Sequence, residues 1–357
     1  MTADQASLLV DLDALAANFA VLRQAAGAAE VAPVVKADAY GLGAAAAARR
    51  LRAEGAARFF VARVAEGAAL RQVLGQGPQI LVLDGCPPGA GPALAAAGLT
   101  PVLNDLTQLE AWRDHGGRGA ALHVDTGLNR LGLSLAEAEA LSRAPPRLGG
   151  LAIELVMSHL SCGSSEGHPM NARQAEAFDA VRGWFPNARA SLANSGGLFQ
   201  GFSLDLARPG ISLYGGGPFE RPDPRIAAVA TFEAPILQVR LVRSGEAIGY
   251  GADFIAERDL SVAILAAGYA DGVLRAQGGL GYGWLSSARR RFLGRISMDL
   301  IAIDVSDAPA AKPGDRVQLL GPQVLLDEAA SAGGTIAYEL LTRLAPRARR
   351  SYRGAAA

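Results

Sequence analysis

VAPVVKADAYGLGAAAAARRLRAEGAARFFVARV, residues 31–64, decides the fold class, because it reads as strand, helix and strand in succession. The apolar runs Val31–Ala37 and Phe59–Val64 have the length and composition of buried strands. The alanine-rich stretch Ala44–Ala53 between them is a good helix former. Helices between strands are what a parallel sheet requires, so this stretch predicts an α/β fold.

The same alternation continues to about residue 214. Each of the first seven strand-like runs is followed by an amphipathic stretch, such as Thr107–His115 or Ala172–Trp184. The six further runs are Gln79–Asp84, Leu99–Asn104, Ala120–Thr126, Leu151–His159, Ala188–Asn194 and Leu206–Tyr214. Eight such units close naturally into a (β/α)8 TIM barrel, which we expect over residues 1–225.

A proline-rich break, RPDPR at residues 221–225, precedes a change of pattern. Strand-like segments separated by turn signals such as SGE, GGLGYG and KPGD follow it, and they predict a mainly β domain over 226–357. The segments are Ala227–Val242, Ser261–Ala267, Phe292–Val305 and Arg316–Leu320, with one late helix at Leu326–Leu344. SLLVDL, at residues 7–12, is a further strand that could pair with either domain.

Composition excludes several classes of function. Half of the residues are hydrophobic, 19% are charged and the formal net charge is zero, so no basic excess points to nucleic acid. No uncharged apolar run is long enough to span a membrane, and the N-terminus has no signal-peptide pattern. The two cysteines, Cys86 and Cys162, form no CxxC pair, and the histidines show no metal-ligand spacing. We therefore expect a cytoplasmic protein without a metal site.

Lys36 is one of only two lysines in the chain, the other being Lys312. It follows the first predicted strand, at the carboxyl end where barrel enzymes place their active sites. A lysine that is partly buried there can be neutral part of the time, as a Schiff base requires. A surface lysine at a strand end is the alternative reading, and position alone leaves both open.

The segments after predicted strands seven and eight suit a phosphate. They are ANSGG, residues 193–197, and ARPGISLYGG, residues 207–216, and barrel enzymes commonly bind phosphate at this place through backbone N–H groups and hydroxyls. Ordinary turns are the alternative. His159 ends strand six and is by itself more often structural, while Arg130 after strand five could be a solvated side chain.

Nine segments, in order and across both domains, resemble the alanine racemase family. They are VVKADAYGLG, DTGLNRLG, MSHLSC, LANSGG, RPGISLYG, IGYGADF, GYADG, GRISMD and GTIAYELLTRLAPRARRSY. The resemblance implies an isomerase that uses pyridoxal 5′-phosphate (PLP) to interconvert L-alanine and D-alanine, either for peptidoglycan or in alanine catabolism. A serine racemase or one of broad specificity remains open, because pocket width cannot be read from sequence.

The resemblance also implies a role for each matching residue. Lys36 would hold PLP, with His159 against the pyridine ring and Arg208 donating to the ring nitrogen. Arg130 and Met298 would contact substrate. The phosphate would be surrounded by Tyr40, Asn194, Ser195, Gly210, Ile211 and Tyr352. Two catalytic bases would serve opposite faces of the α-carbon, Lys36 for the D-enantiomer and Tyr250 for the L-enantiomer. Tyr250 would come from the other subunit of a homodimer.

Two positions bear on rival readings. The family often has a lysine, carbamylated in some members, where this chain has His123, so His123 or a bound anion would have to orient Arg130. Arg208 precedes Pro209, where a PLP decarboxylase of similar barrel fold is expected to place a carboxylate. A PLP carrier without turnover would resemble the barrel alone, and the second domain argues against it.

Overall fold

Residues 5–354 are described by the computed structural model, and they fold as two units. The barrel unit comprises Ala16–Leu213, and the β unit comprises residues 5–15 and 214–354. The division falls within helix α1 (Leu12–Ala26) and just before Tyr214, whereas the proline-rich break suggests a boundary near residue 225. No helix among the described residues is both long and apolar enough to cross a membrane.

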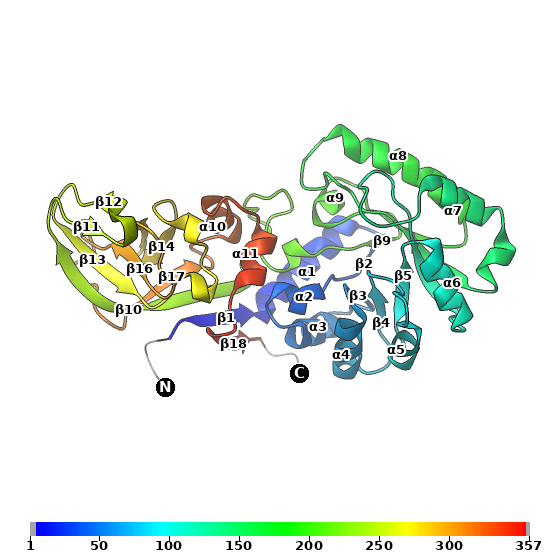
Figure 1. Cartoon of the computed structure of the whole chain (residues 1–357), viewed down its shortest axis with the longest axis horizontal. Helices are drawn as coiled ribbons and strands as arrows, with labels where there is room; N and C mark the ends of the chain where they lie inside the picture. Colours follow the sequence, from blue (N-terminus) through cyan, green and yellow to red (C-terminus); the bar gives the residue numbers. More distant parts are fainter. Residues whose placement is uncertain (1–4, 355–357) are drawn as a thin grey trace. The chain divides into compact units, whose positions relative to one another are not determined.

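The barrel unit contains eight parallel strands. They are β2 (Glu30–Val31), β3 (Arg58–Val61), β4 (Gln79–Val82), β5 (Thr100–Leu103), β6 (Gly119–His123), β7 (Ala152–Met157), β8 (Arg189–Ser191) and β9 (Leu206–Ala207). Strands β3 to β8 pair in that order, and Figure 1 labels β3, β4 and β5 of this series. Strand β2 pairs with β9, a parallel bridge joins Val34 to Phe60, and Arg208 N donates to Ala193 O (2.9 Å). These contacts close the ring, so the predicted (β/α)8 barrel is confirmed.

Helices cover the outside of this ring (Figure 1). They are α3 (Ala44–Ala53), α4 (Val64–Leu74), α5 (Gly91–Ala96), α6 (Leu106–Asp114), α7 (Leu135–Ser142) and α8 (Pro169–Trp184), with the short turns α2 (Lys36–Tyr40), α9 (Ser195–Phe199), η1 (Pro145–Leu148) and η2 (Ile211–Leu213). Beyond their first residue, β3, β4 and β5 are fully buried, as strands covered on both faces must be.

The first and last barrel strands are shorter than their apolar runs predict. The run Val31–Ala37 gives a two-residue strand and then an isolated bridge at Val34, and the run Leu206–Tyr214 ends as a strand at Ala207. Each run contains a proline, Pro33 and Pro209, which has no N–H to donate to the ladder. The backbone is thereby released for turns at the carboxyl end of the barrel.

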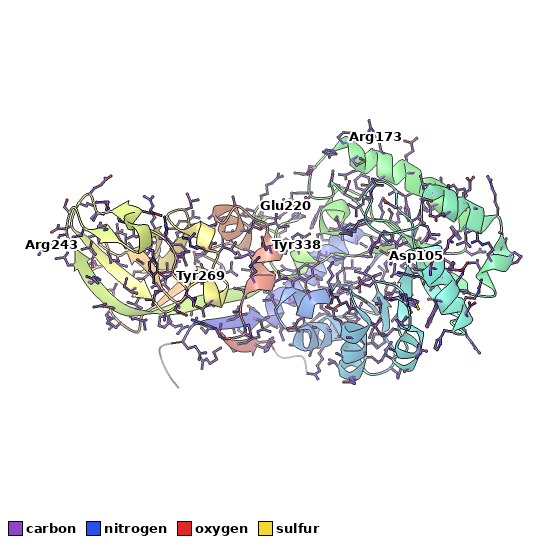
Figure 2. The ribbon with its side chains drawn as sticks, in the orientation of Figure 1. Asp105, Arg173, Glu220, Arg243, Tyr269 and Tyr338 are labelled. Carbon is purple, nitrogen blue, oxygen red and sulfur yellow. The ribbon has the colours of Figure 1, made fainter. Side chains whose placement is uncertain are left out.

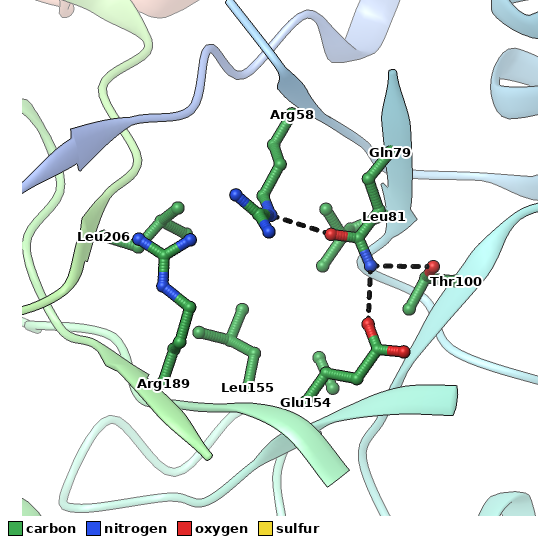
Figure 3. A pocket seen from close by; sticks show the side chains of 9 residues that line it. Arg58, Gln79, Leu81, Thr100, Glu154, Leu155, Arg189 and Leu206 are labelled. Atoms are coloured by element: carbon green, nitrogen blue, oxygen red, sulfur yellow. Dashed lines mark hydrogen bonds between the residues drawn. The ribbon is translucent and has the colours of Figure 1, made fainter. Parts of the chain in front are cut away.

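A polar network lines a small pocket at the amino-terminal end of the barrel (Figure 3). Gln79 is its centre, because Oε1 accepts from Arg58 Nε (2.8 Å) while Nε2 donates to Glu154 Oε2 (2.8 Å) and Thr100 Oγ1 (3.2 Å). Glu30 accepts hydrogen bonds from both Arg58 and Arg189 in the same region. These polar side chains are therefore satisfied largely by one another.

The β unit is built on antiparallel strands. They are β1 (Ser7–Asp11), β10 (Ala230–Val242), β11 (Ala247–Ile248), β12 (Phe254–Ile255), β13 (Leu260–Leu265), β14 (Tyr282–Leu285), β15 (Ala288–Leu293), β16 (Ile301–Asp304), β17 (Arg316–Leu320) and β18 (Arg349–Arg353). Strands β10, β13, β16, β15, β14 and β17 pair in a closed ring. Strand β1 joins this unit, antiparallel to β10 and parallel to β18, which answers where SLLVDL pairs.

Two predicted elements of the β unit are wrong in their extent. The late helix is two helices, α10 (Leu326–Ala332) and α11 (Ala337–Arg343), because Gly333 and Gly334 interrupt it. The predicted strand Phe292–Val305 is also two strands, since Gly294 adopts a left-handed φ of 64° and the segment up to Leu300 forms a loop. Three turns complete the unit, η3 (Tyr250–Ala252), η4 (Tyr269–Asp271) and η5 (Arg275–Gln277).

Candidate active site

Lys36 lies at the carboxyl end of the first barrel strand. Just before it, Val35 N donates to Phe60 O (2.8 Å), which fixes the lysine backbone to strand β3. The side chain is partly buried, and burial, followed by the charge of Arg130, lowers the pKa of its amine. A lowered pKa leaves more of the amine neutral at pH 7, which a nucleophile or a base needs.

The residues after Lys36 form a left-handed turn. All four residues 37–40 have φ between 52° and 57°. Left-handed backbone costs roughly 1–2 kcal/mol per residue outside glycine, so the turn depends on contacts that hold it. Asp38 provides one, because its Oδ1 accepts from Ala44 N (2.7 Å). The turn directs Tyr40 into the interior, where its side chain is buried.

Tyr40, Ser195 and Gly210 meet where the chain leaves β8 and β9. Ser195 Oγ accepts from Gly210 N (3.1 Å) and from Ser212 N (3.4 Å). A Cβ at position 210 would lie 2.1 Å from Tyr40 Oη, so only glycine fits there. Asn194 starts α9 by accepting from Gly197 N (2.9 Å). Small residues, hydroxyls and main-chain N–H groups thus gather at one place, as a phosphate requires.

Ser212 is a candidate that the sequence analysis missed, although it stands in ARPGISLYGG. It is fully buried, and its Oγ has no hydrogen-bond partner among residues 5–354. Leaving a buried hydroxyl unpaired costs about 1–3 kcal/mol, which a ligand oxygen would relieve. The neighbouring Ile211 is also buried. An unpaired hydroxyl next to Ser195 therefore fits the phosphate role predicted for this segment.

Arg208 is buried without a carboxylate partner among the described residues. Its guanidinium donates to Ser191 Oγ and to Ser158 O (2.5 Å), and it lies 6.0 Å from the centre of the Phe60 ring. Burial lowers the pKa of Arg208 to about 9, which leaves it charged at neutral pH. One side-chain oxygen and one backbone oxygen fix the plane of the guanidinium. Its remaining N–H groups therefore have a defined direction.

The end of the barrel is strongly cationic around His159. Burial comes first in lowering the pKa of His159 well below its usual value, and the positive charges of Arg208 and Arg130 follow. The imidazole is consequently neutral at pH 7. Its main chain is held by Gln174, whose Nε2 donates to the carbonyl of residue 159 (2.9 Å). Several basic groups converging on one histidine make this pocket suited to an anionic ligand.

His123 and Arg130 share the end of β6. His123 is buried, its Nδ1 lies 2.8 Å from Asn104 Oδ1, and burial followed by Arg208 lowers its pKa to about 4. The segment carrying Arg130 folds back here, since Leu133 N donates to the carbonyl of His123 (2.9 Å). Arg130 is exposed and makes no hydrogen bond or ion pair within residues 5–354.

Tyr250, Met298 and Tyr352 belong to the β unit, and all three are exposed, Tyr250 by 70%. The GYADG and SMD motifs meet there, because Tyr269 N donates to Ser297 O (3.1 Å) and the next residue donates to Met298 O (3.0 Å). Tyr269, also exposed, is marked in Figure 2. Tyr352 lies on β18, in register with Val10 of β1.

These observations test whether the residues present fit pyridoxal phosphate. The barrel unit supplies a partly buried lysine with a lowered pKa, a glycine-lined group of hydroxyl and N–H groups, and a buried arginine, Arg208, with no carboxylate partner among the described residues. Lys36 suits the aldehyde of this cofactor, the group around Ser195 suits its phosphate, and Arg208 suits its ring nitrogen. The fit therefore rests on the chemistry of Lys36, Ser195 and Arg208 as well as on the sequence motifs.

Family models match both units. The model "Alanine racemase, N-terminal domain" matches residues 10–218, and "Alanine racemase, C-terminal domain" matches residues 229–352. A catabolic alanine racemase of Mesorhizobium japonicum is 46% identical over 98% of this chain and 93% of its own length. An alanine racemase of Rhizobium meliloti is 44% identical over 98% of this chain and 97% of its own length.

Solved structures agree with these sequence relatives. The alanine racemase of Bartonella henselae, with covalently bound pyridoxal phosphate, superimposes with a TM-score of 0.92 at 36% identity and covers 98% of this chain and 99% of that one. The alanine racemase of Acinetobacter baumannii gives a TM-score of 0.91 at 30% identity, over 98% of this chain and 100% of that one. The likeness thus spans both units.

Proposed function

This chain belongs to the alanine racemase family, and from that premise we propose that it interconverts L-alanine and D-alanine with pyridoxal phosphate held by Lys36. It is an isomerase that depends on this cofactor. The observation that carries the proposal is the meeting of Lys36, His159, Arg208 and the Ser195–Gly210 contact at the carboxyl end of one barrel. The roles of individual residues below are part of the proposal.

Bound pyridoxal phosphate supplies an electron sink for the pair left behind when the α-proton is removed. Lys36 would hold it covalently, His159 would pack on the ring and Arg208 would donate to the ring nitrogen. Its phosphate would be bound by Tyr40, Asn194, Ser195, Gly210, Ile211 and Tyr352. The unpaired hydroxyl of Ser212 beside Ser195 supports this assignment.

Proton transfer needs one base on each face of the α-carbon. Lys36 Nζ serves the D-enantiomer, helped by burial that favours its neutral form. Tyr250 Oη serves the L-enantiomer. A nearby cation favours the deprotonated form of a base such as Tyr250 Oη, and the basic groups of the barrel pocket are suitable for this. Removing the proton on one face and returning it on the other inverts the centre.

Arg208 would disfavour transamination as a side reaction. A guanidinium donates hydrogen bonds but cannot accept one, so it favours an unprotonated ring nitrogen. An arginine at this place would therefore give a weaker electron sink than a carboxylate would, which suits proton transfer better than transamination. Its buried contacts to Ser191 and Ser158 hold it in this role. Arg130 and Met298 contact the substrate, and the unpaired guanidinium of Arg130 suits its carboxylate.

A homodimer with shared active sites is part of the proposal. Among the described residues, all the exposed large hydrophobic side chains except Leu131 belong to the β unit. They are Leu237, Leu241, Tyr250, Ile255, Tyr269, Leu280, Met298, Leu300, Ile336 and Tyr352. A second copy covering such side chains would take them out of water, and it would allow each Tyr250 to serve the other subunit. Sedimentation of the purified protein tests this directly.

We also place the protein in the cytoplasm, where free thiols persist. Cys86 and Cys162 are unpaired, which suits a reducing compartment. The cellular purpose is either D-alanine supply for peptidoglycan or alanine catabolism. A deletion strain that requires D-alanine for growth would indicate supply, whereas one that grows normally but fails on alanine as carbon source would indicate catabolism.

A chirality assay tests the activity itself. Protein with pyridoxal phosphate is given L-alanine in D₂O, and circular dichroism is followed together with α-deuteration. We expect loss of optical activity with deuterium at the α-carbon, and in Tyr250→Phe this exchange should fail from the L-enantiomer. Release of CO₂ without racemisation would overturn the proposal. Serine and larger amino acids, run in parallel, measure specificity.

A further inference from the structure

Glu66 joins two neighbouring βα units of the barrel through one carboxylate. It stands in the first turn of α4, where Oε2 accepts from Ala62 N (2.8 Å) and Arg63 N (3.1 Å). These two bonds cap the helix in the usual way of a glutamate at its third position. The other oxygen, Oε1, accepts from Ala37 N (2.8 Å), which belongs to the turn that follows Lys36.

Glu137 shows what a capping glutamate does on its own. It occupies the same third position in α7, where Oε2 accepts from both N and Oγ of Ser134 (2.8 Å each). Among the described residues, its hydrogen bonds at this end all go to Ser134, at the start of its own helix. The bond from Glu66 to Ala37 is therefore additional to capping, and Glu137 is a matched reference for the capping function alone.

Lys36 is consequently held on both sides by the same βα unit. On its amino side, Val35 N donates to Phe60 O in β3, and on its carboxyl side, Ala37 N donates to Glu66 in α4. Between these two bonds the chain turns from strand into the left-handed segment 37–40, a conformation that L-residues adopt only when their surroundings impose it.

We propose that Glu66 is a positioning residue for Lys36, which fixes the lysine backbone so that the amine points into the barrel mouth in one orientation. The inference rests on the proposed function, since it assigns a purpose to the position of that amine. The charge of Glu66 also affects the amine of Lys36. Burial and Arg130 lower the pKa of Lys36, while the carboxylates of Glu66 and Asp84 act in the opposite direction.

Capture of pyridoxal phosphate by the cofactor-free protein measures both effects without turnover. A Lys312→Arg background leaves Lys36 as the only lysine, and borohydride reduction followed by peptide mapping confirms where the cofactor is attached. The capture rate rises with pH as the amine becomes neutral. Its midpoint reports the pKa of Lys36, and its plateau at high pH reports how well the neutral amine is placed.

The two variants Glu66→Gln and Glu66→Asp separate position from charge. Glu66→Gln has one acceptor oxygen for two separate sites and no charge, so we expect a lower plateau and a midpoint moved to lower pH. Glu66→Asp keeps the charge but is too short to span both sites, so we expect a lower plateau with a midpoint near that of the wild type. In both, kcat for alanine should fall about 10- to 100-fold with little change in KM.

Glu137→Gln is the control, and it should leave plateau, midpoint and kcat within about twofold of the wild type. Thermal unfolding of all variants checks that each is folded at the assay temperature. The inference is overturned if the plateau of both Glu66 variants matches that of Glu137→Gln. A wild-type protein that captures pyridoxal phosphate on Lys36 but does not racemise alanine would refute the proposed function while leaving the positioning result readable.

Discussion

His123 Nδ1 lies 2.8 Å from Asn104 Oδ1, and this contact fixes which ring nitrogen carries the proton. Asn104 Nδ2 donates to Leu83 O and Val102 O (2.9 Å each), so Oδ1 must face the ring as an acceptor. Because the pKa of His123 is lowered to about 4, the ring is neutral at pH 7, donates through Nδ1 and leaves Nε2 as an acceptor. Such an acceptor suits the guanidinium of Arg130.

Replacing His123 by alanine should weaken substrate binding more than cofactor binding. A hydrogen bond from Arg130 to His123 Nε2, formed when the substrate binds, would contribute about 1.5–3 kcal/mol, so we expect the KM for alanine to rise at least tenfold, or roughly 1.4 kcal/mol. The Kd for pyridoxal phosphate should change by less than about twofold. His115→Ala, at an exposed position after α6, is the control. Unchanged KM and Kd together would show that His123 does not orient Arg130.

The pH dependence of stability should also report His123. Its folded pKa of about 4 lies below the ordinary value of 6.5, so between these two pH values the unfolded chain takes up a proton that the folded chain does not. The contribution of His123 to the free energy of unfolding is complete above pH 6.5. It falls by about 3 kcal/mol as the pH drops to 4. Urea unfolding from pH 7 to 4 should show a shallower loss in His123→Gln. An unchanged slope would mean that His123 titrates normally in the folded protein.

Gly210→Ala should damage the cofactor site by steric conflict with Tyr40. The added Cβ would lie 2.1 Å from Tyr40 Oη, so the phenol must move, and we expect the Kd for pyridoxal phosphate to rise at least tenfold. In a Tyr40→Phe background the same change should cost less, because the nearest atom is gone. Gly183→Ala, where a Cβ meets nothing within 4 Å in helix α8, should be neutral or stabilising by about 0.5–1 kcal/mol. Equal effects of Gly210→Ala in both backgrounds would contradict the proposed contact.

The barrel and the place of Lys36 were predictable because they depend on local signals. Short apolar runs separated by helix formers mark the parallel strands, and α3 has the bounds that its alanine-rich sequence predicts. The strand ends were less predictable, since Pro33 and Pro209 stop the ladder inside apolar runs. Gly333 and Gly334 likewise divide a helix that the apolar pattern alone extends.

The finer parts of the site were not predictable, because they depend on contacts between distant segments. Nothing in the composition of residues 37–40 signals four consecutive positive φ values without glycine. The link from Glu66 to Ala37 and the pairing of Asn104 with His123 each join different βα units. That the hydroxyl of Ser212 has no hydrogen-bond partner can be recognised only when the positions of all its neighbours are known. A motif identifies candidate residues, whereas the packing of the folded chain determines which of their atoms are free to bind a ligand.

Gln79→Leu should separate stability from catalysis, because Gln79 lies in the polar network at the end of the barrel opposite Lys36. Its amide joins Arg58, Glu154 and Thr100, and an apolar side chain would leave these partly buried groups without their partner. We expect unfolding free energy to fall by about 1–3 kcal/mol in urea titrations. The kcat for alanine below the unfolding transition should stay within about twofold of the wild type. Gln24→Leu, exposed on α1, should change stability by no more than about 0.5 kcal/mol. A fall in kcat without loss of stability would mean that the amino-terminal network acts on the catalytic end, and that the two ends of the barrel are not independent.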